Sequence, residues 1–211
     1  MTQPKNLFIA LVGPSGAGKN TLLERFIELD KAQEAPFTFN LPTTATTRAI
    51  RDGEIEGVHH YFLTEDEFDA RLKNGDFLEH SAPHGRQYGT LKQEFEEQLS
   101  KSHLIKDIDW VGARDIRKKM PDNTLAILVL PPTRQELERR LNARGNSGTE
   151  RLATIEAAAK DIQTSIYTDN SFVSEDLAGS YRKDYDFVIY NDDLDAAVIR
   201  LYKFIQKKMQ R

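Results

Sequence analysis

The residues that could carry chemistry begin with a glycine-rich segment near the amino terminus, Gly13-Pro14-Ser15-Gly16-Ala17-Gly18-Lys19. This spacing is that of a phosphate-binding loop, or P-loop, in which backbone N–H groups turn toward phosphate oxygens and the lysine neutralises their charge. An apolar run from Leu7 to Val12 precedes it, and helical spacing follows from Thr21 to Leu29. Because strand, loop and helix occur in the required order, an ordinary glycine-rich turn is disfavoured. The segment predicts an ATP site formed by Gly13, Ser15, Gly16, Ala17, Gly18, Lys19, Asn20 and Thr21.

Asn20 departs from the P-loop pattern, because Ser or Thr normally stands at this position and offers a hydroxyl to Mg²⁺. An amide oxygen can also bind Mg²⁺, but the side chain is bulkier and its geometry differs. Thr21 points about 100° away around the helix and is a poor substitute. Asn20 is therefore the candidate metal ligand of the loop, and the alternative that we expect is Mg²⁺ held through water or by acidic residues elsewhere.

A second candidate site lies in Thr46-Thr47-Arg48-Ala49-Ile50-Arg51-Asp52-Gly53-Glu54, which places two arginines three residues apart. Two guanidinium groups on one short segment suit a dianionic monophosphate, although a solvated charged turn would show the same pattern. Further motifs follow along the chain and favour the phosphate site: Phe77-Leu78-Glu79-His80, Tyr88-Gly89-Thr90, Asp107-Ile108-Asp109-Trp110-Val111-Gly112-Ala113 and Asn191-Asp192-Asp193-Leu194-Asp195.

These motifs resemble those of the guanylate kinase family and occur in the family's order. The resemblance runs from Phe8 to about Ala143 and resumes from Tyr185 to Ala197. A P-loop alone is weakly specific, whereas TTRxxRxGE followed by FLE, YGT and IDWxGA is strongly specific. The resemblance implies transfer of a phosphoryl group from ATP to GMP, and also to dGMP, with Mg²⁺ as a cofactor.

The resemblance also implies which residues bind the acceptor nucleotide. Arg48, Arg51 and Tyr88 would hold its phosphate, and Glu54 is counted among the substrate-binding residues of the same segment.

The guanine base would be recognised by three further residues. Glu79 would accept from the N1 and N2 donors, while Thr44 and Thr90 would donate to O6. Adenine presents the reversed pattern of donors and acceptors and would leave these groups unpaired.

The remaining implied roles concern the transferred group and the ATP base. Asp107 and Asp109 would sit between the two substrates, Arg140 and Arg144 would neutralise the transferring phosphoryl group from the lid side, and Asn191 would contact the adenine. The catalytic set implied is Lys19, Arg48, Asp107, Arg140 and Arg144.

The sequence departs from the family pattern at His59-His60, where the family has an Asp-Tyr pair. The lost tyrosine hydroxyl would have donated to the acceptor phosphate. His60 could replace it, most strongly as imidazolium, which predicts an acceptor affinity that weakens as the pH rises through about 6.5. The alternative is that both histidines are surface residues at the start of a strand.

Two departures concern the lid. Ile155 occupies the position at which the family has an additional lid arginine, and Arg151 is the nearest arginine that could replace it. The segment from Gln163 to Arg182 is longer than the usual connection, and nothing in its composition suggests a chemical role.

The elements that would position these residues indicate an α/β fold. Apolar runs recur before helical segments, as in a parallel sheet covered by helices. We therefore expect a P-loop NTPase core formed by residues 1–36, 101–144 and 185–211 of a single domain. Residues 37–100, with shorter alternating segments, predict an inserted α+β acceptor-binding subdomain, and polar residues 145–184 predict a lid.

Composition indicates which binding partners and which cellular compartment to expect. Its 211 residues carry a formal net charge of −4, so no general basic field favours nucleic acid or an anionic membrane. No cysteine is present, which excludes disulfides and fits a reducing compartment. We expect a cytoplasmic protein that binds neither nucleic acid nor membrane, while its oligomeric state, monomer or dimer, stays open.

Two alternatives to an ATP:GMP phosphotransferase remain at this point. A diverged kinase could act on another phosphate-bearing acceptor, although the Glu79 and Thr90 pair would then have no purpose. A guanylate-kinase-like module could bind phosphorylated peptides, although such modules usually have decayed P-loops.

Overall fold

The computed structural model describes residues 6–82, 85–143, 167–168, 171–172 and 185–209. The chain separates into two compact units, one of residues 1–10 and 37–125 and the other of residues 11–36 and 126–211. Arg144, Arg151, Ile155 and almost all of the predicted lid lie outside the described residues. The division into core, acceptor-binding subdomain and lid stays a prediction.

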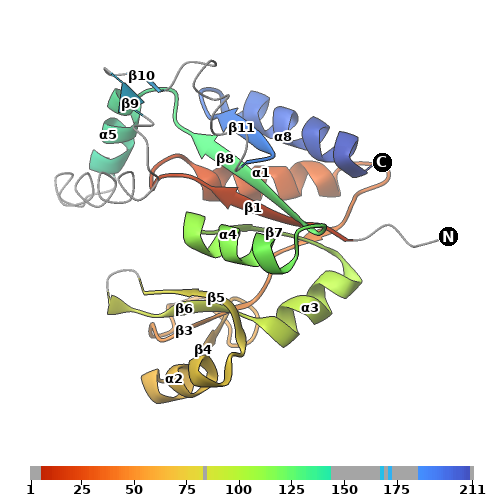
Figure 1. The fold of residues 1–211 in the computed structure, drawn as a ribbon. Helices are drawn as coiled ribbons and strands as arrows, with labels where there is room; N and C mark the ends of the chain where they lie inside the picture. Colours follow the sequence, from red (N-terminus) through yellow and green to blue (C-terminus); the bar gives the residue numbers. More distant parts are fainter. Residues whose placement is uncertain (1–5, 83–84, 144–166, 169–170, 173–184, 210–211) are drawn as a thin grey trace. The chain divides into compact units, whose positions relative to one another are not determined.

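The larger sheet is parallel, has five strands and confirms the expected α/β class (Figure 1). Continuous apolar runs supply its inner strands, and all five residues of β1 are buried. The strand order is β11 (Phe187–Tyr190), β8 (Thr124–Leu130), β1 (Phe8–Val12), β7 (His103–Asp107) and β2 (Phe39–Asn40). The P-loop follows the carboxyl end of β1, the edge at which parallel α/β sheets present their ligand sites.

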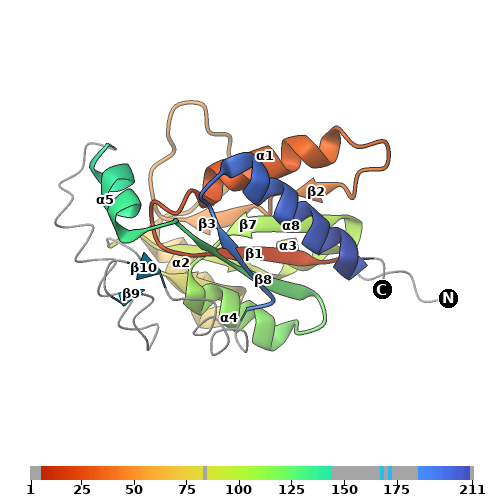
Figure 2. The ribbon, with the colours of Figure 1, turned by 90° about the horizontal axis from the view of Figure 1, so that it is seen from above.

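Helices α1 and α8 pack against each other in the unit of residues 11–36 and 126–211, and Figure 2 shows them side by side. The rings of Phe26 and Tyr202 lie 6.0 Å apart at this contact. The amphipathic pattern from Leu194 to Met209 predicts a helix, and α8 has these bounds. The described elements of the unit, besides the strands given above, are α1 (Lys19–Lys31), α5 (Arg134–Asn142), β9 (Tyr167–Thr168), β10 (Ser171–Phe172) and α8 (Leu194–Met209).

The unit of residues 1–10 and 37–125 contains a second, mixed sheet. Its strand order is β4 (His60–Phe62), β3 (Thr44–Thr46), β6 (Tyr88–Leu91) and β5 (Phe77–Ser81). Strands β3 and β4 are parallel, whereas β6 pairs with both of its neighbours in antiparallel fashion. The helices of this unit are α2 (Glu65–Asn74), α3 (Lys92–Lys101) and α4 (Trp110–Lys119).

A small apolar core joins α2 to this mixed sheet. Ala45, Phe68, Phe77 and Leu91 form the cluster, and the rings of Phe68 and Phe77 stack with centroids 4.4 Å apart. Every member is nearly or fully shielded from solvent, so the cluster fixes the sheet that carries the acceptor-side residues.

Local capping explains where two of the helices begin. The motif Thr64-Glu65-Asp66-Glu67 predicts a capping box, and α2 confirms it: Thr64 Oγ1 accepts from the Glu67 N–H and the Glu67 carboxylate accepts from the Thr64 N–H. The motif Thr133-Arg134-Gln135-Glu136 shows the same signature before α5, and Thr133 Oγ1 accepts from the Glu136 N–H at 3.1 Å. The Glu136 carboxylate instead accepts from Arg139 and Arg140. The described part of this helix ends at Asn142.

Candidate active site

The P-loop depends on glycine at two positions where the backbone makes close approaches. Gly13 has a φ of +149°, and a Cβ there would lie 2.1 Å from the Val129 carbonyl oxygen. Gly18 has a φ of +86°, and its Cβ would lie 2.4 Å from Asn191 Nδ2. Gly18 is also the N-cap of α1 and offers no side-chain cap, which leaves the first N–H groups of the helix available to a phosphate.

Lys19 begins α1 and folds back over the loop. Its Nζ donates to the carbonyl oxygens of Gly13 at 2.8 Å and Pro14 at 3.1 Å. Asn20 and Thr21, in the same helical turn, are exposed, and so is Ser15 within the loop. The ammonium group is thus held at the loop that the sequence predicts to receive the ATP phosphates.

Asn191 connects the end of β11 to the P-loop. Its amide Nδ2 donates to the Ala17 carbonyl at 2.8 Å, and 5% of the residue is exposed. Arg140 Nη2 donates to the Asn191 carbonyl at 3.2 Å, while Arg140 Nε donates to Glu136 Oε1 at 2.7 Å. These contacts bring Arg140 and Asn191 to the loop, whereas Arg144 lies outside the described residues.

On the acceptor side, Arg48 is buried and paired with Glu54. Its Nη1 donates to Glu54 Oε2 at 2.8 Å and its Nη2 to Oε1 at 2.7 Å, while Nη1 also donates to the Ala49 carbonyl. Hydrogen bonds from Arg48, and then from the Arg51 backbone, lower the pKa of Glu54 to about 2. The carboxylate therefore stays ionised and fixes the plane of the guanidinium.

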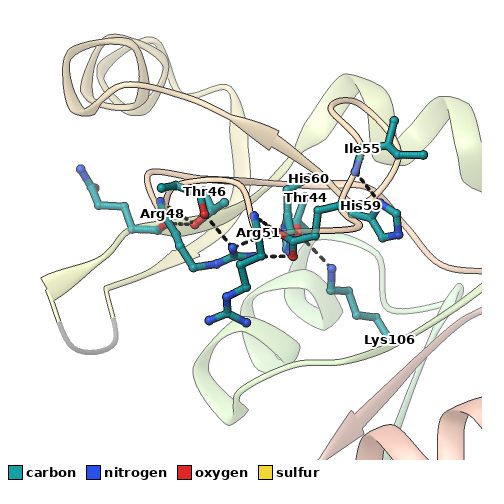
Figure 3. Close-up of polar contacts among 11 residues, drawn as sticks. Thr44, Thr46, Arg48, Arg51, Ile55, His59, His60 and Lys106 are labelled. Carbon is teal, nitrogen blue, oxygen red and sulfur yellow. Dashed lines mark hydrogen bonds and ion pairs between the residues drawn. The ribbon is translucent and has the colours of Figure 1, made fainter.

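Arg51 differs from Arg48 in its exposure. Its backbone N–H donates to Glu54 Oε2 at 2.8 Å, and its side chain extends away from the segment, as Figure 3 shows. The ring of Tyr88 lies 6.3 Å from that of His60, and Tyr88 also contributes to the raised pKa of Arg48. The structure thus brings together the residues that the sequence predicts around the acceptor phosphate.

The predicted guanine-reading residues Glu79 and Thr90 are joined by a short hydrogen bond. Thr90 Oγ1 donates to Glu79 Oε1 at 2.5 Å, across the β5–β6 pair. Burial raises the pKa of Glu79 to about 7, against the opposing effect of the Thr90 hydrogen bond. Gly112 lies so close that a Cβ there would meet Glu79 Oε2 at 2.9 Å.

Thr44, the third predicted base contact, has a different neighbourhood from the other two. Its Oγ1 lies 2.9 Å from His60 Nδ1 and accepts from Lys106 Nζ at 3.0 Å. Figure 3 shows the Lys106 side chain reaching toward Thr44 from β7. Sequence reasoning missed Lys106, although a lysine next to the two apolar residues of β7, His103–Asp107, was a visible signal.

The expected titration of His60 near pH 6.5 is wrong for the free protein. Burial, followed by the charges of Lys106 and Arg48, lowers the pKa of His60 to about 4. The imidazole is therefore neutral at physiological pH. His59 is exposed, and its Nδ1 accepts from the Ile55 N–H at 2.9 Å.

The two aspartates of the Asp107-Ile108-Asp109 motif occupy different structural positions. Asp107 is the last residue of β7 and is partly buried. Asp109 is exposed and caps α4, with Oδ1 accepting from the Gly112 N–H at 2.9 Å. This cap holds Gly112, and with it the helix end next to Glu79.

Within the part of the chain that the structure describes, no group of three or more His, Cys, Asp or Glu side chains could hold a metal ion. No helix among the described residues is long and apolar enough to cross a membrane.

Comparison with known proteins places these features in a family. The guanylate kinase family model matches residues 5–208. The guanylate kinase of Vibrio parahaemolyticus is 38% identical over 196 residues, covering 92% of this chain and 84% of its own. That of Shewanella violacea is 36% identical over 210 residues, covering 99% and 90%. A crystal structure of guanylate kinase from Anaplasma phagocytophilum superposes with a TM-score of 0.62 at 25% identity, covering 99% of this chain and 89% of that one. The chain therefore belongs to the guanylate kinase family.

Proposed function

We propose that the guanylate kinase activity of this chain, transfer of a phosphoryl group from ATP to GMP, is carried by the residues gathered at the P-loop and around Arg48 and Glu79. Activity and family rest on relatives that match nearly the whole chain. The single observation that carries the acceptor is the buried pair of Glu79 and Thr90, joined at 2.5 Å. The Glu79 carboxylate, held by Thr90, matches the adjacent N1 and N2 donors of a guanine edge, whereas the N1 acceptor of adenine would offer it no proton.

The acceptor phosphate is assigned to Arg48, Arg51 and Tyr88. Nη1 of Arg48 donates to Glu54 and to the Ala49 carbonyl, and Nη2 donates to Glu54, so the guanidinium is oriented before an anion binds. Glu54 can only accept hydrogen bonds, so its contribution to substrate binding acts through the position of Arg48 rather than through contact with a dianion. The exposed Arg51 adds a second positive charge.

ATP is assigned to the loop from Gly13 to Lys19 and to the first turn of α1. Backbone N–H groups at the helix start and the ammonium of Lys19 would bind the phosphates. We assign the adenine contact to Asn191, whose amide donates to the Ala17 carbonyl and whose own carbonyl accepts from Arg140. Arg144 completes the proposed catalytic set.

At this loop the protein offers Mg²⁺ few ligands of its own. The exposed amide oxygen of Asn20 is available on the first turn of α1, and Mg²⁺ characteristically keeps several waters while binding nucleotide phosphates. The ion would neutralise charge on the β- and γ-phosphates. We assign Asn20 to contact it through water rather than directly.

Catalysis in this account consists of positioning and charge stabilisation. Phosphoryl transfer passes through a loose transition state, so no covalent intermediate on the protein is required. Lys19 and Arg140 stabilise charge on the transferred group, and Arg48 and Asp107 orient the acceptor. We further propose that dGMP is accepted, that the protein acts in the cytoplasm, and that neither nucleic acid nor membrane is a partner.

Separate substitutions test the two halves of the site. Lys19→Ala is expected to abolish transfer, whereas Arg51→Ala is expected to raise the KM for GMP with little change in that for ATP. An Arg51→Ala variant with unchanged GMP kinetics would refute the acceptor assignment. Lys31→Ala, an exposed lysine at the far end of α1, is the matched control for Lys19.

A further inference from the structure

Three side chains from three strands form a line of hydrogen bonds beside the acceptor segment. Lys106 Nζ on β7 lies 3.0 Å from Thr44 Oγ1 on β3, and Thr44 Oγ1 lies 2.9 Å from His60 Nδ1 on β4 (Figure 3). Lys106 Nζ lies 3.4 Å from the Pro42 carbonyl as well. All of these residues belong to the same compact unit.

Counting protons along this line determines its direction. Burial lowers the pKa of Lys106, while the charges of Asp107 and Glu79 favour its ammonium form. As an ammonium group Lys106 can only donate, so the Thr44 oxygen accepts from it. If His60 Nδ1 also carried a proton, the Thr44 oxygen would accept twice and its own proton would lose its partner in a residue that is 6% exposed. A buried donor without an acceptor is costly. The favoured arrangement has the Thr44 hydroxyl donating to His60 Nδ1.

We propose that Lys106, acting through Thr44, is a positioning residue that holds His60 as a neutral imidazole with its proton on Nε2. His60 is then a neutral N–H donor that takes the place of a tyrosine hydroxyl toward the acceptor phosphate. This last part rests on the proposed acceptor site, whereas the state of the ring does not.

The charges around His60 support the neutral ring. Lys106 and Arg48 both disfavour the imidazolium, and burial lowers the pKa of His60 further than either. Glu54 favours the imidazolium, but its carboxylate is already bound by both Nη atoms of Arg48. The charged or titratable groups facing the ring are Lys106, Arg48, Glu54, His59 and Tyr88.

The arrangement has a consequence for base recognition. In the free protein the hydroxyl proton of Thr44 is directed to His60 Nδ1, as that of Thr90 is directed to Glu79 Oε1. Either hydroxyl must therefore turn away from its present acceptor before it can donate to guanine O6.

Nitrogen-15 NMR of the histidine rings in the full-length free protein tests the proposal. Pyrrole-type and pyridine-type nitrogens have well-separated shifts, and His60→Gln identifies the His60 signals. The wild type is expected to show a pyridine-type Nδ1 and a protonated Nε2, unchanged from pH 8 to pH 5.5. A protonated Nδ1, or an imidazolium forming near pH 6.5, would overturn the proposal without any variant.

Lys106→Met tests the relay, because it removes the charge and the donor while keeping an unbranched chain. The pKa of His60 is expected to rise from about 4 toward its ordinary 6.5, although only part of the way because the ring stays buried. Lys101→Met, an exposed lysine on α3, is the matched control and should leave the ring unchanged. Thermal unfolding checks that both variants fold, and an unchanged His60 titration in folded Lys106→Met would refute the role of Lys106.

Steady-state kinetics separate this proposal from the acceptor assignment. In the wild type, the KM for GMP should not rise between pH 5.5 and pH 7. In Lys106→Met, the KM for GMP should rise several-fold over that range, because the imidazolium is lost. If NMR finds the expected ring but His60→Gln leaves the KM for GMP unchanged, the relay stands and the assignment of His60 to the phosphate fails.

Discussion

The carboxylate of Glu54 binds both Nη atoms of Arg48, at 2.8 and 2.7 Å, while Arg48 is 5% exposed. A buried guanidinium is thereby oriented before any nucleotide arrives. The same carboxylate accepts from the Arg51 N–H, so one side chain sets the geometry of the whole arginine segment. Preorganisation of this kind reduces the cost of fixing a cation when the acceptor phosphate binds.

Replacing Glu54 with Gln tests this relationship. The amide can accept through one oxygen only, so Arg48 would lose one charge-assisted contact and its fixed orientation. We expect the KM for GMP to rise about tenfold, with a smaller effect on the KM for ATP. Glu97→Gln, on the exposed face of α3, is the control. A lower KM for GMP would mean that Glu54 chiefly repels the phosphate, contrary to this account.

The raised pKa of Glu79 predicts a pH dependence of acceptor binding. The guanine donors require the ionised carboxylate, which forms in the free protein only as the pH rises through about 7. The KM for GMP should therefore fall between pH 6 and 8. The GMP phosphate itself ionises near pH 6, so Glu79→Gln is the necessary comparison. The Glu79→Gln variant should bind GMP more weakly and should retain only the pH dependence that comes from ionisation of the GMP phosphate.

The same shift predicts how stability changes with pH. Between the ordinary value of 4.5 and about 7, the folded protein keeps a proton that the unfolded chain has lost. The contribution of Glu79 to the free energy of unfolding is full below pH 4.5 and is lost as the pH rises through 7, by a total of about 3 kcal/mol. Urea unfolding of wild type and Glu79→Gln at pH 5 and pH 8 measures it. Equal pH dependence in the two proteins would contradict the buried, protonated carboxyl.

Gly18→Ala tests the contact between the P-loop and Asn191. An alanine at a φ of +86° is strained by about 1–2 kcal/mol, and its Cβ would also displace the Asn191 amide. Gly75→Ala is a matched control, because Gly75 has a φ of +74° with no atom within 4 Å of the added Cβ. We expect Gly18→Ala to lose at least 1 kcal/mol more unfolding free energy than the control and to raise the KM for ATP. Equal losses would show that the loop accommodates the methyl group.

Asn20 offers a test of metal binding at the loop. If Asn20 meets Mg²⁺ through water, Asn20→Ala should change the Mg²⁺ concentration for half-maximal activity by less than about twofold. Asn20→Ser restores a hydroxyl of the kind that P-loops use and should lower that concentration. Magnesium titrations at fixed ATP provide the measurement. A large rise in Asn20→Ala would identify Asn20 as a direct ligand.

The sequence predicted the fold well where local patterns carry it. The apolar run of β1, the turn glycines after it and the capping box at Thr64 are short-range signals, and each was confirmed. The bounds of α8 followed from its amphipathic spacing, because one face packs on α1. The alternating residues from Phe37 to Asn40 predict a short extended segment, of which only Phe39 and Asn40 pair with β7 as strand β2.

The candidate site was predictable in its members but not in their mutual contacts. The TTRxxR motif drew attention to Arg48, and the family resemblance implied roles for Glu79 and Thr90. Neither shows that Glu54 pairs with Arg48 or that Thr90 donates to Glu79. The charge state of His60 was wrong because it depends on burial and on Lys106, which is 46 residues away in the chain. Electrostatic environments of this kind arise from tertiary structure and leave no local pattern.

The most direct test of the central claim follows ADP formation with MgATP against GMP, dGMP, AMP, UMP, CMP and no acceptor. Guanine recognition by Glu79 and Thr90 predicts rapid turnover with GMP and dGMP and only background with the others. Glu79→Gln should lose this discrimination, and Lys19→Ala should be inactive with every acceptor. Comparable turnover with AMP, or no turnover with GMP despite measurable GMP binding, would contradict the account.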